Sequence, residues 1–126
     1  RSGRLRTRDV FDIEKLSKYF AINDLLGAGH GSWWSNERYY YNPITSKLEP
    51  IGFDGDTGDT NLYPRIIFGE VKIQFNEILD YFGQKTFLKT LYKDELFIKS
   101  YIQELNKVSQ KDYLKLFTRW TSIDSF

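Results

Sequence analysis

The chain has 126 residues, which suits one domain, and its 40% hydrophobic and 17% aromatic content favours a folded globule over a disordered segment. Its 18 basic and 17 acidic residues nearly cancel, so no overall field indicates a nucleic-acid or membrane-surface partner. No cysteine is present, which excludes disulfides and thiolate metal sites but leaves the cellular compartment open.

The first eight residues hold the one local excess of charge, in Arg1, Arg4, Arg6 and Arg8. A solvated tail is the favoured interpretation, and a phosphate-binding arm is the alternative. The chain contains no methionine and opens on Arg1, so we expect a single domain, residues 1–126, cut from a longer polypeptide. No apolar run reaches the length of a membrane span.

A helix is predicted next, capped by Asp9 or Asp12 and ending at about Leu26. Its apolar residues form one arc on a helical wheel, namely Ile13, Leu16, Tyr19, Phe20 and Leu26. Asn23 falls near the middle of this arc and must find a partner or cost about 1–3 kcal/mol. We expect Asn23 to bind the loop that follows, and glycines after Leu26 to end the helix.

A β-hairpin is predicted after a loop rich in glycine and tryptophan. Its strands run from Glu37 to Tyr41 and from Lys47 to Phe53, and an Asn-Pro turn joins them. Because the strands are of similar length, Asp54 returns toward the level of Asn36.

From residue 54 onward the sequence predicts a loop, then a segment of ambiguous structure, and then helices. An acidic loop is predicted over 54–61, the segment 62–75 is ambiguous, and helices are predicted over 76–82, 84–92, 95–108 and 112–120. Asp94 can cap the helix over 95–108, whose inward face is predicted to carry Phe97, Tyr101, Leu105 and Val108. The hydrophobic period changes from 2 to 3.6 near Asn76. The chain is therefore expected to be an α+β domain with at least three C-terminal helices packed on the first.

Three polar features converge near the hairpin base: Asn36, the Asp54–Asp56 pair and the loop that carries His30. Hard divalent cations prefer carboxylate and amide oxygens, so a metal site is one interpretation of this group. A simple Asp-Gly turn is the other. His30 is either a structural hydrogen-bonding residue or a general base.

The sequence resembles the CotH spore-coat kinase family in three stretches. They are residues 19–27 (YFAINDLLG), 36–43 (NERYYYNP) and 48–54 (LEPIGFD). The resemblance implies a C-lobe-like part of a divergent protein-kinase-like fold, mostly helical with a β-hairpin. It also implies a Mg²⁺- or Mn²⁺-dependent ATP phosphotransferase acting on a coat or cell-envelope protein, with an extracytoplasmic, envelope or spore-coat location. No nucleic-acid partner is expected.

By the same resemblance, Asn36 and Asp54 bind the metal and its nucleotide, and Asp56 is a further metal-binding acid. The family's catalytic Asp falls at Gly31, five residues before Asn36. Either His30, predicted to point toward Asn36 and Asp54, or Asp24 replaces it, or the domain binds nucleotide without turnover. A catalytically inactive CotH-like domain or a calcium- or glycan-binding structural module is the alternative function. Nothing before Asp9 supplies the nucleotide-clamping lysine lobe of a kinase.

Overall fold

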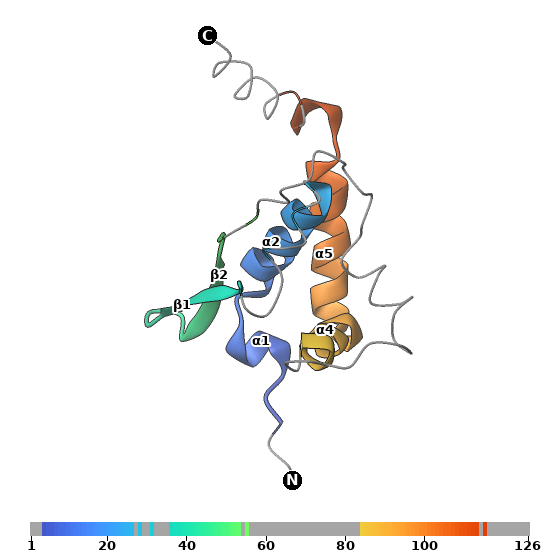
Figure 1. Cartoon of the computed structure of the whole chain (residues 1–126). Coiled ribbons are helices and arrows are strands. Elements are labelled where there is room, and N and C mark those ends of the chain that lie inside the picture. Colours follow the sequence, from blue (N-terminus) through green and yellow to red (C-terminus); the bar gives the residue numbers. More distant parts are fainter. Residues whose placement is uncertain are drawn as a thin grey trace.

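Two helices far apart in the sequence, α2 (Ile13–Leu25) and α5 (Glu95–Val108), lie side by side at the centre of the fold (Figure 1). The structure is a computed structural model, and it describes residues 4–26, 28, 31, 36–53, 55, 84–113 and 115. The short helix α1 (Thr7–Val10) precedes α2, and α4 (Gln84–Lys93) packs against α5. A hairpin of β1 (Arg38–Asn42) and β2 (Lys47–Ile51) contacts α2 away from α5 (Figure 1).

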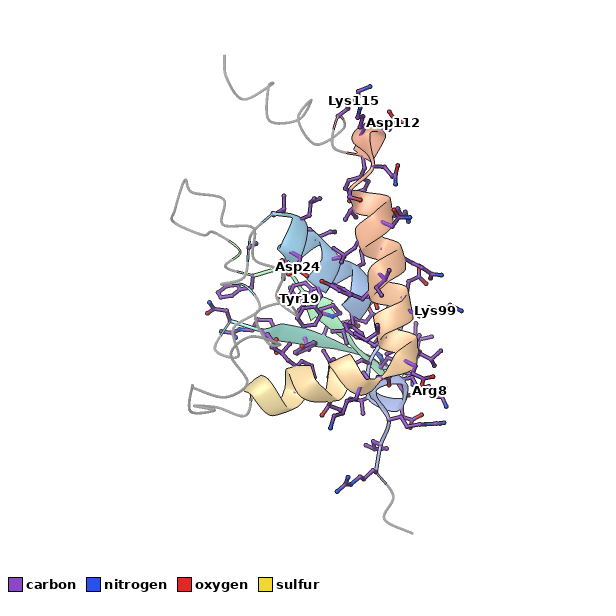
Figure 2. All side chains as sticks on the ribbon, turned by 90° about the vertical axis from the view of Figure 1, so that its right-hand side faces the viewer. Arg8, Tyr19, Asp24, Lys99, Asp112 and Lys115 are labelled. Carbon is purple, nitrogen blue, oxygen red and sulfur yellow. The ribbon has the colours of Figure 1, made fainter. Side chains whose placement is uncertain are left out.

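Aromatic and aliphatic side chains fill the space between these helices (Figure 2). Phe20 of α2 meets Phe97 of α5 edge to face, with ring centroids 6.0 Å apart. Ser17 is fully buried at the same crossing, and its hydroxyl donates to the Phe97 carbonyl at 3.5 Å. The buried core comprises Leu16, Phe20, Ala21, Leu88, Leu91, Phe97, Tyr101 and Val108. The predicted inward faces of both helices are thus confirmed.

Aspartate caps begin both long helices. The Asp12 carboxylate accepts from the Lys15 N–H, and the Asp94 carboxylate accepts from the Phe97 N–H, each at 3.1 Å. These bonds satisfy N–H groups that have no partner inside a helix. The predicted bounds of α5 and its Asp94 cap are confirmed.

The first predicted helix is present as α2, and the short helix α1 precedes it. Phe11 is extended, with φ −109° and ψ 149°, and forms a bridge with Leu48 of the hairpin. The Asp12 N–H donates to the Leu48 carbonyl at 3.0 Å instead of continuing α1. Of the two predicted caps, Asp12 is therefore the one that begins α2.

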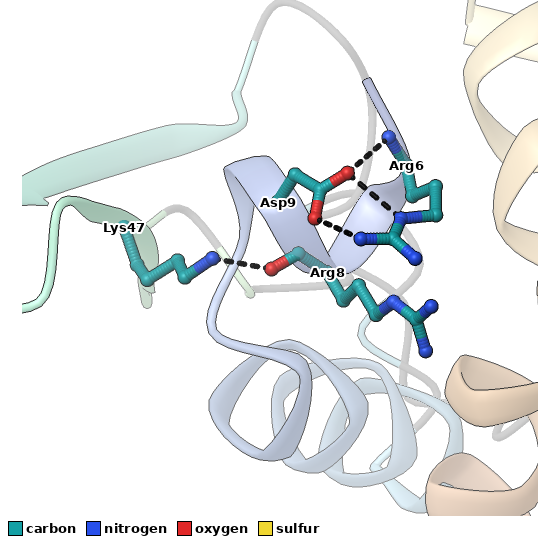
Figure 3. Close-up of polar contacts among 4 residues, drawn as sticks. All are labelled: Arg6, Arg8, Asp9 and Lys47. Atoms are coloured by element: carbon teal, nitrogen blue, oxygen red, sulfur yellow. Dashed lines mark hydrogen bonds and ion pairs between the residues drawn. The ribbon is translucent and has the colours of Figure 1, made fainter. Parts of the chain in front are cut away.

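The N-terminal arginines are partly held by the fold (Figure 3). The Asp9 carboxylate accepts from the backbone N–H of Arg6 at 2.9 Å and from its guanidinium at 2.9 and 3.0 Å. The hydrogen bonds from Arg6 lower the pKa of Asp9 to about 2. The Lys47 ammonium donates to the Arg8 carbonyl, which ties β2 to α1 (Figure 3). Arg6 and Arg8 thus belong to the folded part of the chain.

The hairpin has the predicted turn and an antiparallel register from Arg38↔Ile51 to Asn42↔Lys47. The Asn42 side-chain oxygen accepts from the Ile44 N–H at 2.9 Å, as expected of an Asx turn. Glu49 accepts from Asn42 at 2.8 Å and pairs with Lys15 of α2 at 2.7 Å. The Lys15 contact is the main cause that lowers the pKa of Glu49. The hairpin is therefore fixed to α2 as well as to α1.

The predicted α+β class, mostly helical with a β-hairpin, is confirmed. Two predicted C-terminal helices are present as α4 and α5, and residues 111–113 and 115 are helical where the third is expected. The predictions for 56–83 and for 116–120 lie outside the described residues. Within the described ranges, no helix is both long and apolar enough to cross a membrane.

Candidate functional site

Three segments meet at the base of the hairpin: the loop after α2, the start of β1 and the end of β2. A methyl group added at Gly31 would lie 3.1 Å from the Phe53 carbonyl oxygen and 3.3 Å from the Gly55 Cα. One added at Gly55 would lie 3.6 Å from the Ala28 Cβ. Of the loop after α2, the described residues Ala28 and Gly31 thus pack on Phe53 and Gly55, which flank position 54.

Asn36 is half-buried in the turn immediately before β1. The register that pairs Arg38 with Ile51 carries Phe53 back to the level of Asn36. The Arg38 guanidinium carbon lies 4.9 Å from the centroid of the Phe53 ring, a cation–π distance that fixes this end of the hairpin. The predicted return of the second strand is confirmed as far as Ile51, where β2 ends two residues before the predicted bound at Phe53.

Asp24 lies on the side of α2 that faces α5. Its carboxylate accepts a hydrogen bond from the Tyr101 hydroxyl of α5. Burial, followed by the contact with Asp24, raises the pKa of Tyr101. This bond connects α2 to α5 and supports a bracing role for Asp24 (Figure 2 shows its position beside α5).

The other predicted site residues, His30, Asp54 and Asp56, lie outside the described residues. Within the described ranges, no group of three or more histidine, aspartate or glutamate side chains is placed to hold a metal ion. Asn36 is therefore the predicted metal-binding residue whose position the structure gives.

Glu37 is the residue that the sequence interpretation missed. Its side chain is buried, with 9% exposure, and Oε2 accepts from the Tyr39 hydroxyl at 3.2 Å. Oε1 is buried and has no hydrogen-bond partner among the described residues. Burial raises the pKa of Glu37 to about 7, against the smaller lowering effect of Tyr39.

Glu37 is connected to the loop after α2 through two tyrosines. Burial, then Glu37 and Tyr19, raise the pKa of Tyr39, so the two phenols interact electrostatically. The Tyr19 hydroxyl donates to the Gly31 carbonyl at 2.7 Å. We call Tyr19, Gly31, Glu37 and Tyr39 the Glu37 cluster. It lies between α2 and the hairpin, beside Asn36.

The pattern of the strand could have identified Glu37. Side chains two residues apart on a strand share a face, so in the predicted strand from Glu37 to Tyr41, Glu37 shares the face of Tyr39. Tyr39 packs on Phe11 with ring centroids 5.4 Å apart, which makes this the inward face. A glutamate in step with an inward aromatic residue must therefore be buried, and buried carboxylates are rare without a partner.

Two neighbouring residues bring side-chain oxygens to the start of β1. Asn36 offers an amide oxygen, and Glu37 offers a buried carboxylate oxygen that lacks a hydrogen-bond donor among the described residues. Position 31 offers nothing, because its Cβ direction is filled by the backbone at Phe53 and Gly55. An acid at position 31 would therefore require the backbone at Phe53 and Gly55 to shift by a few tenths of an ångström.

No protein-family model, no curated protein and no solved structure matches this chain. The expected kinase-like lobe and the CotH resemblance therefore receive no support from known proteins. The α+β class follows from the structure alone.

Proposed function

We propose that the chain carries the metal-binding part of a Mg²⁺-dependent, ATP-using phosphotransferase site of the CotH kind, which acts on a coat or envelope protein. Asn36 and Asp54 hold the metal ion, with Asp56 as a further acid. The ion carries the nucleotide phosphates, because in phosphoryl transfer metal ions neutralise the charge that develops on the transferred group.

The observation that supports this proposal is the packing of Gly31 against Phe53 and Gly55. It brings the loop after α2 to the residues on both sides of position 54, at the level of Asn36. A magnesium site needs only one or two carboxylates because the ion keeps several waters. A sparse set of protein oxygens at this junction is therefore sufficient.

A domain that binds nucleotide without transferring phosphate is the second candidate, and Gly31 favours it. An aspartate at this position would meet backbone at 3.1 and 3.3 Å. The family's usual base is thus replaced by a residue that the packing requires to be small. Positioning and charge neutralisation supply most of the rate enhancement in kinase-type transfer, so this substitution alone does not exclude activity.

The test measures phosphate transfer from labelled ATP by the polypeptide that contains this chain, with Mg²⁺ or Mn²⁺. We expect transfer, and we expect Asp54→Asn and Asn36→Ala each to lower it by about 100-fold. Asp112→Asn and Asn106→Ala are matched controls, because both residues are exposed on the C-terminal part of the chain. Full activity in Asp54→Asn would reject the proposal.

The same measurements distinguish the phosphotransferase from the second candidate, a domain that binds nucleotide without transferring phosphate. Binding of Mg²⁺–ATP without transfer, lost in Asp54→Asn, identifies a nucleotide-binding domain without turnover. Binding of Ca²⁺ with no response to nucleotide identifies the structural module instead.

A further inference from the structure

We propose that Glu37 is a ligand of the divalent cation held by Asn36, and that its buried oxygen Oε1 contacts the ion. The inference rests on the proposed function, since that function supplies the cation. It adds a metal ligand that neither the acidic loop nor the family resemblance indicates.

The first argument is the unequal use of the two carboxylate oxygens. Oε2 accepts from the Tyr39 hydroxyl at 3.2 Å, while Oε1 is buried without a donor among the described residues. A buried carboxylate is costly unless it is paired, hydrogen-bonded or bound to a metal. The Tyr39 bond fixes the carboxylate and leaves one oxygen for a ligand.

The second argument is that no positive charge is shown paired with the Glu37 carboxylate among the described residues. Arg38 is next in sequence, but its guanidinium lies over the Phe53 ring and donates to the Glu37 backbone carbonyl at 2.9 Å. Apart from Glu37 itself, the side chains of the cluster are the phenols of Tyr19 and Tyr39, which are neutral hydrogen-bond donors. A hard cation satisfies a carboxylate oxygen in such surroundings.

The third argument is position. Asn36 lies in the turn before β1 and not in the strand itself, so the alternation of the strand does not force the two side chains to opposite faces. The Glu37 cluster reaches Gly31 through the Tyr19 bond, and Gly31 packs on the residues that flank position 54. Glu37 is thus built into the junction proposed to hold the ion.

The test is Mn²⁺ binding to the full 126-residue chain without nucleotide, followed by electron paramagnetic resonance of the free ion. We expect Glu37→Gln to weaken binding about 10–100-fold. Glu49→Gln is a matched control in the same hairpin, because Glu49 is already paired with Lys15 and Asn42. Glu104→Gln is a second control, because Glu104 has a buried oxygen without a partner but lies on α5. Both controls should bind Mn²⁺ like the unmodified chain.

A second measurement does not depend on the Glu37→Gln variant. In Mn²⁺-loaded chain labelled with ¹³C at the glutamate carboxyl, electron–nuclear double resonance should detect a coupled glutamate carbon. The coupling should persist in Glu104→Gln. Its absence from the unmodified chain overturns the inference even if Glu37→Gln fails to fold.

The outcomes distinguish the inference from the proposed function. Equal Mn²⁺ binding by the unmodified chain and Glu37→Gln, with loss in Asp54→Asn, rejects Glu37 as a ligand and leaves the phosphotransferase proposal standing. A glutamate-bound Mn²⁺ in a polypeptide that does not use ATP supports the inference and rejects the function. No Mn²⁺ binding at all rejects both.

Discussion

At the scale of single residues, Glu37 differs from the paired carboxylates Asp9 and Glu49 in the direction of its pKa shift. Burial raises the pKa of Glu37 to about 7, whereas Asp9 and Glu49 are partly buried, paired with basic groups, and have lowered pKa values. The difference follows from solvent: a paired surface carboxylate keeps its charge easily, while a buried one retains its proton. Stability and pH are therefore coupled through Glu37.

We expect the metal-free chain to lose stability as pH rises from about 5 to about 8. In this window native Glu37 still holds a proton that the unfolded chain has released, so the free energy of unfolding falls, by about 2 kcal/mol. Below the unfolded pKa the contribution is fully present. Tyr39 donates to the carboxyl and, because its own pKa is raised, stays neutral across the window. Urea titrations at several pH values measure the slope.

Glu37→Gln should remove this slope, because its amide does not titrate, and should be the more stable form at pH 8. Glu49→Gln should keep the slope. Parallel pH profiles for the unmodified chain and Glu37→Gln would contradict the assignment.

Residue-scale packing was the least predictable from the sequence. Gly31 reads as one glycine among several in a loop, and its role as the contact with Phe53 and Gly55 depends on residues more than 20 positions away. The burial of Glu37 could have been predicted, since it follows from its alternation with Tyr39. The close approach at Gly31 could not, because no local pattern encodes the neighbouring backbone.

At the scale of elements, local sequence signals were sufficient to predict a helix where no contact with a distant strand changed its bounds. The helix α5 was predicted with its bounds because the Asp94 cap and the spacing of Phe97, Tyr101 and Val108 agree. The short helix α1 was not predicted, and the bridge from Phe11 to Leu48 separates it from α2. A residue that pairs with a distant strand leaves its helix irrespective of its helical propensity.

Replacement of the α2 cap tests this boundary. Asp12→Ala should lower the free energy of unfolding by about 1 kcal/mol, because the Lys15 N–H loses its acceptor at 3.1 Å. Asp12→Asn should stay close to the unmodified chain, since asparagine caps equally well. Thermal unfolding followed by circular dichroism measures both. An equal loss in the two variants would show that charge, and not the cap, is responsible.

At the scale of the whole molecule, the crossing of α2 and α5 determines stability. Phe97 is fully buried between Phe20 and Tyr101, with both ring centroids 6.0 Å away. The fully buried Ser17 lets the helices approach closely there. The hairpin and α4 are attached to this pair, so its loss affects the entire fold.

Phe97→Ala should lower the free energy of unfolding by about 3–5 kcal/mol, because it removes a ring and leaves a cavity at the crossing. Ile102→Ala on the same helix is the matched control, since Ile102 is 58% exposed and should change stability by less than about 0.5 kcal/mol. Urea unfolding measures both. A Phe97→Ala variant as stable as the Ile102 control would place the core elsewhere.

The contact between Ser17 and Phe97 spans 80 positions of sequence. During synthesis, α2 leaves the ribosome long before the residues of α5 that cover it, at about 5–20 residues per second. For several seconds the side chains of Leu16 and Phe20 lack the partner that buries them in the native fold. Contacts between distant residues also slow folding, because the intervening loop must close first. The nascent chain therefore depends on its last third before its first third can be buried, and a truncation that removes α5 would expose the apolar face of α2 to aggregation.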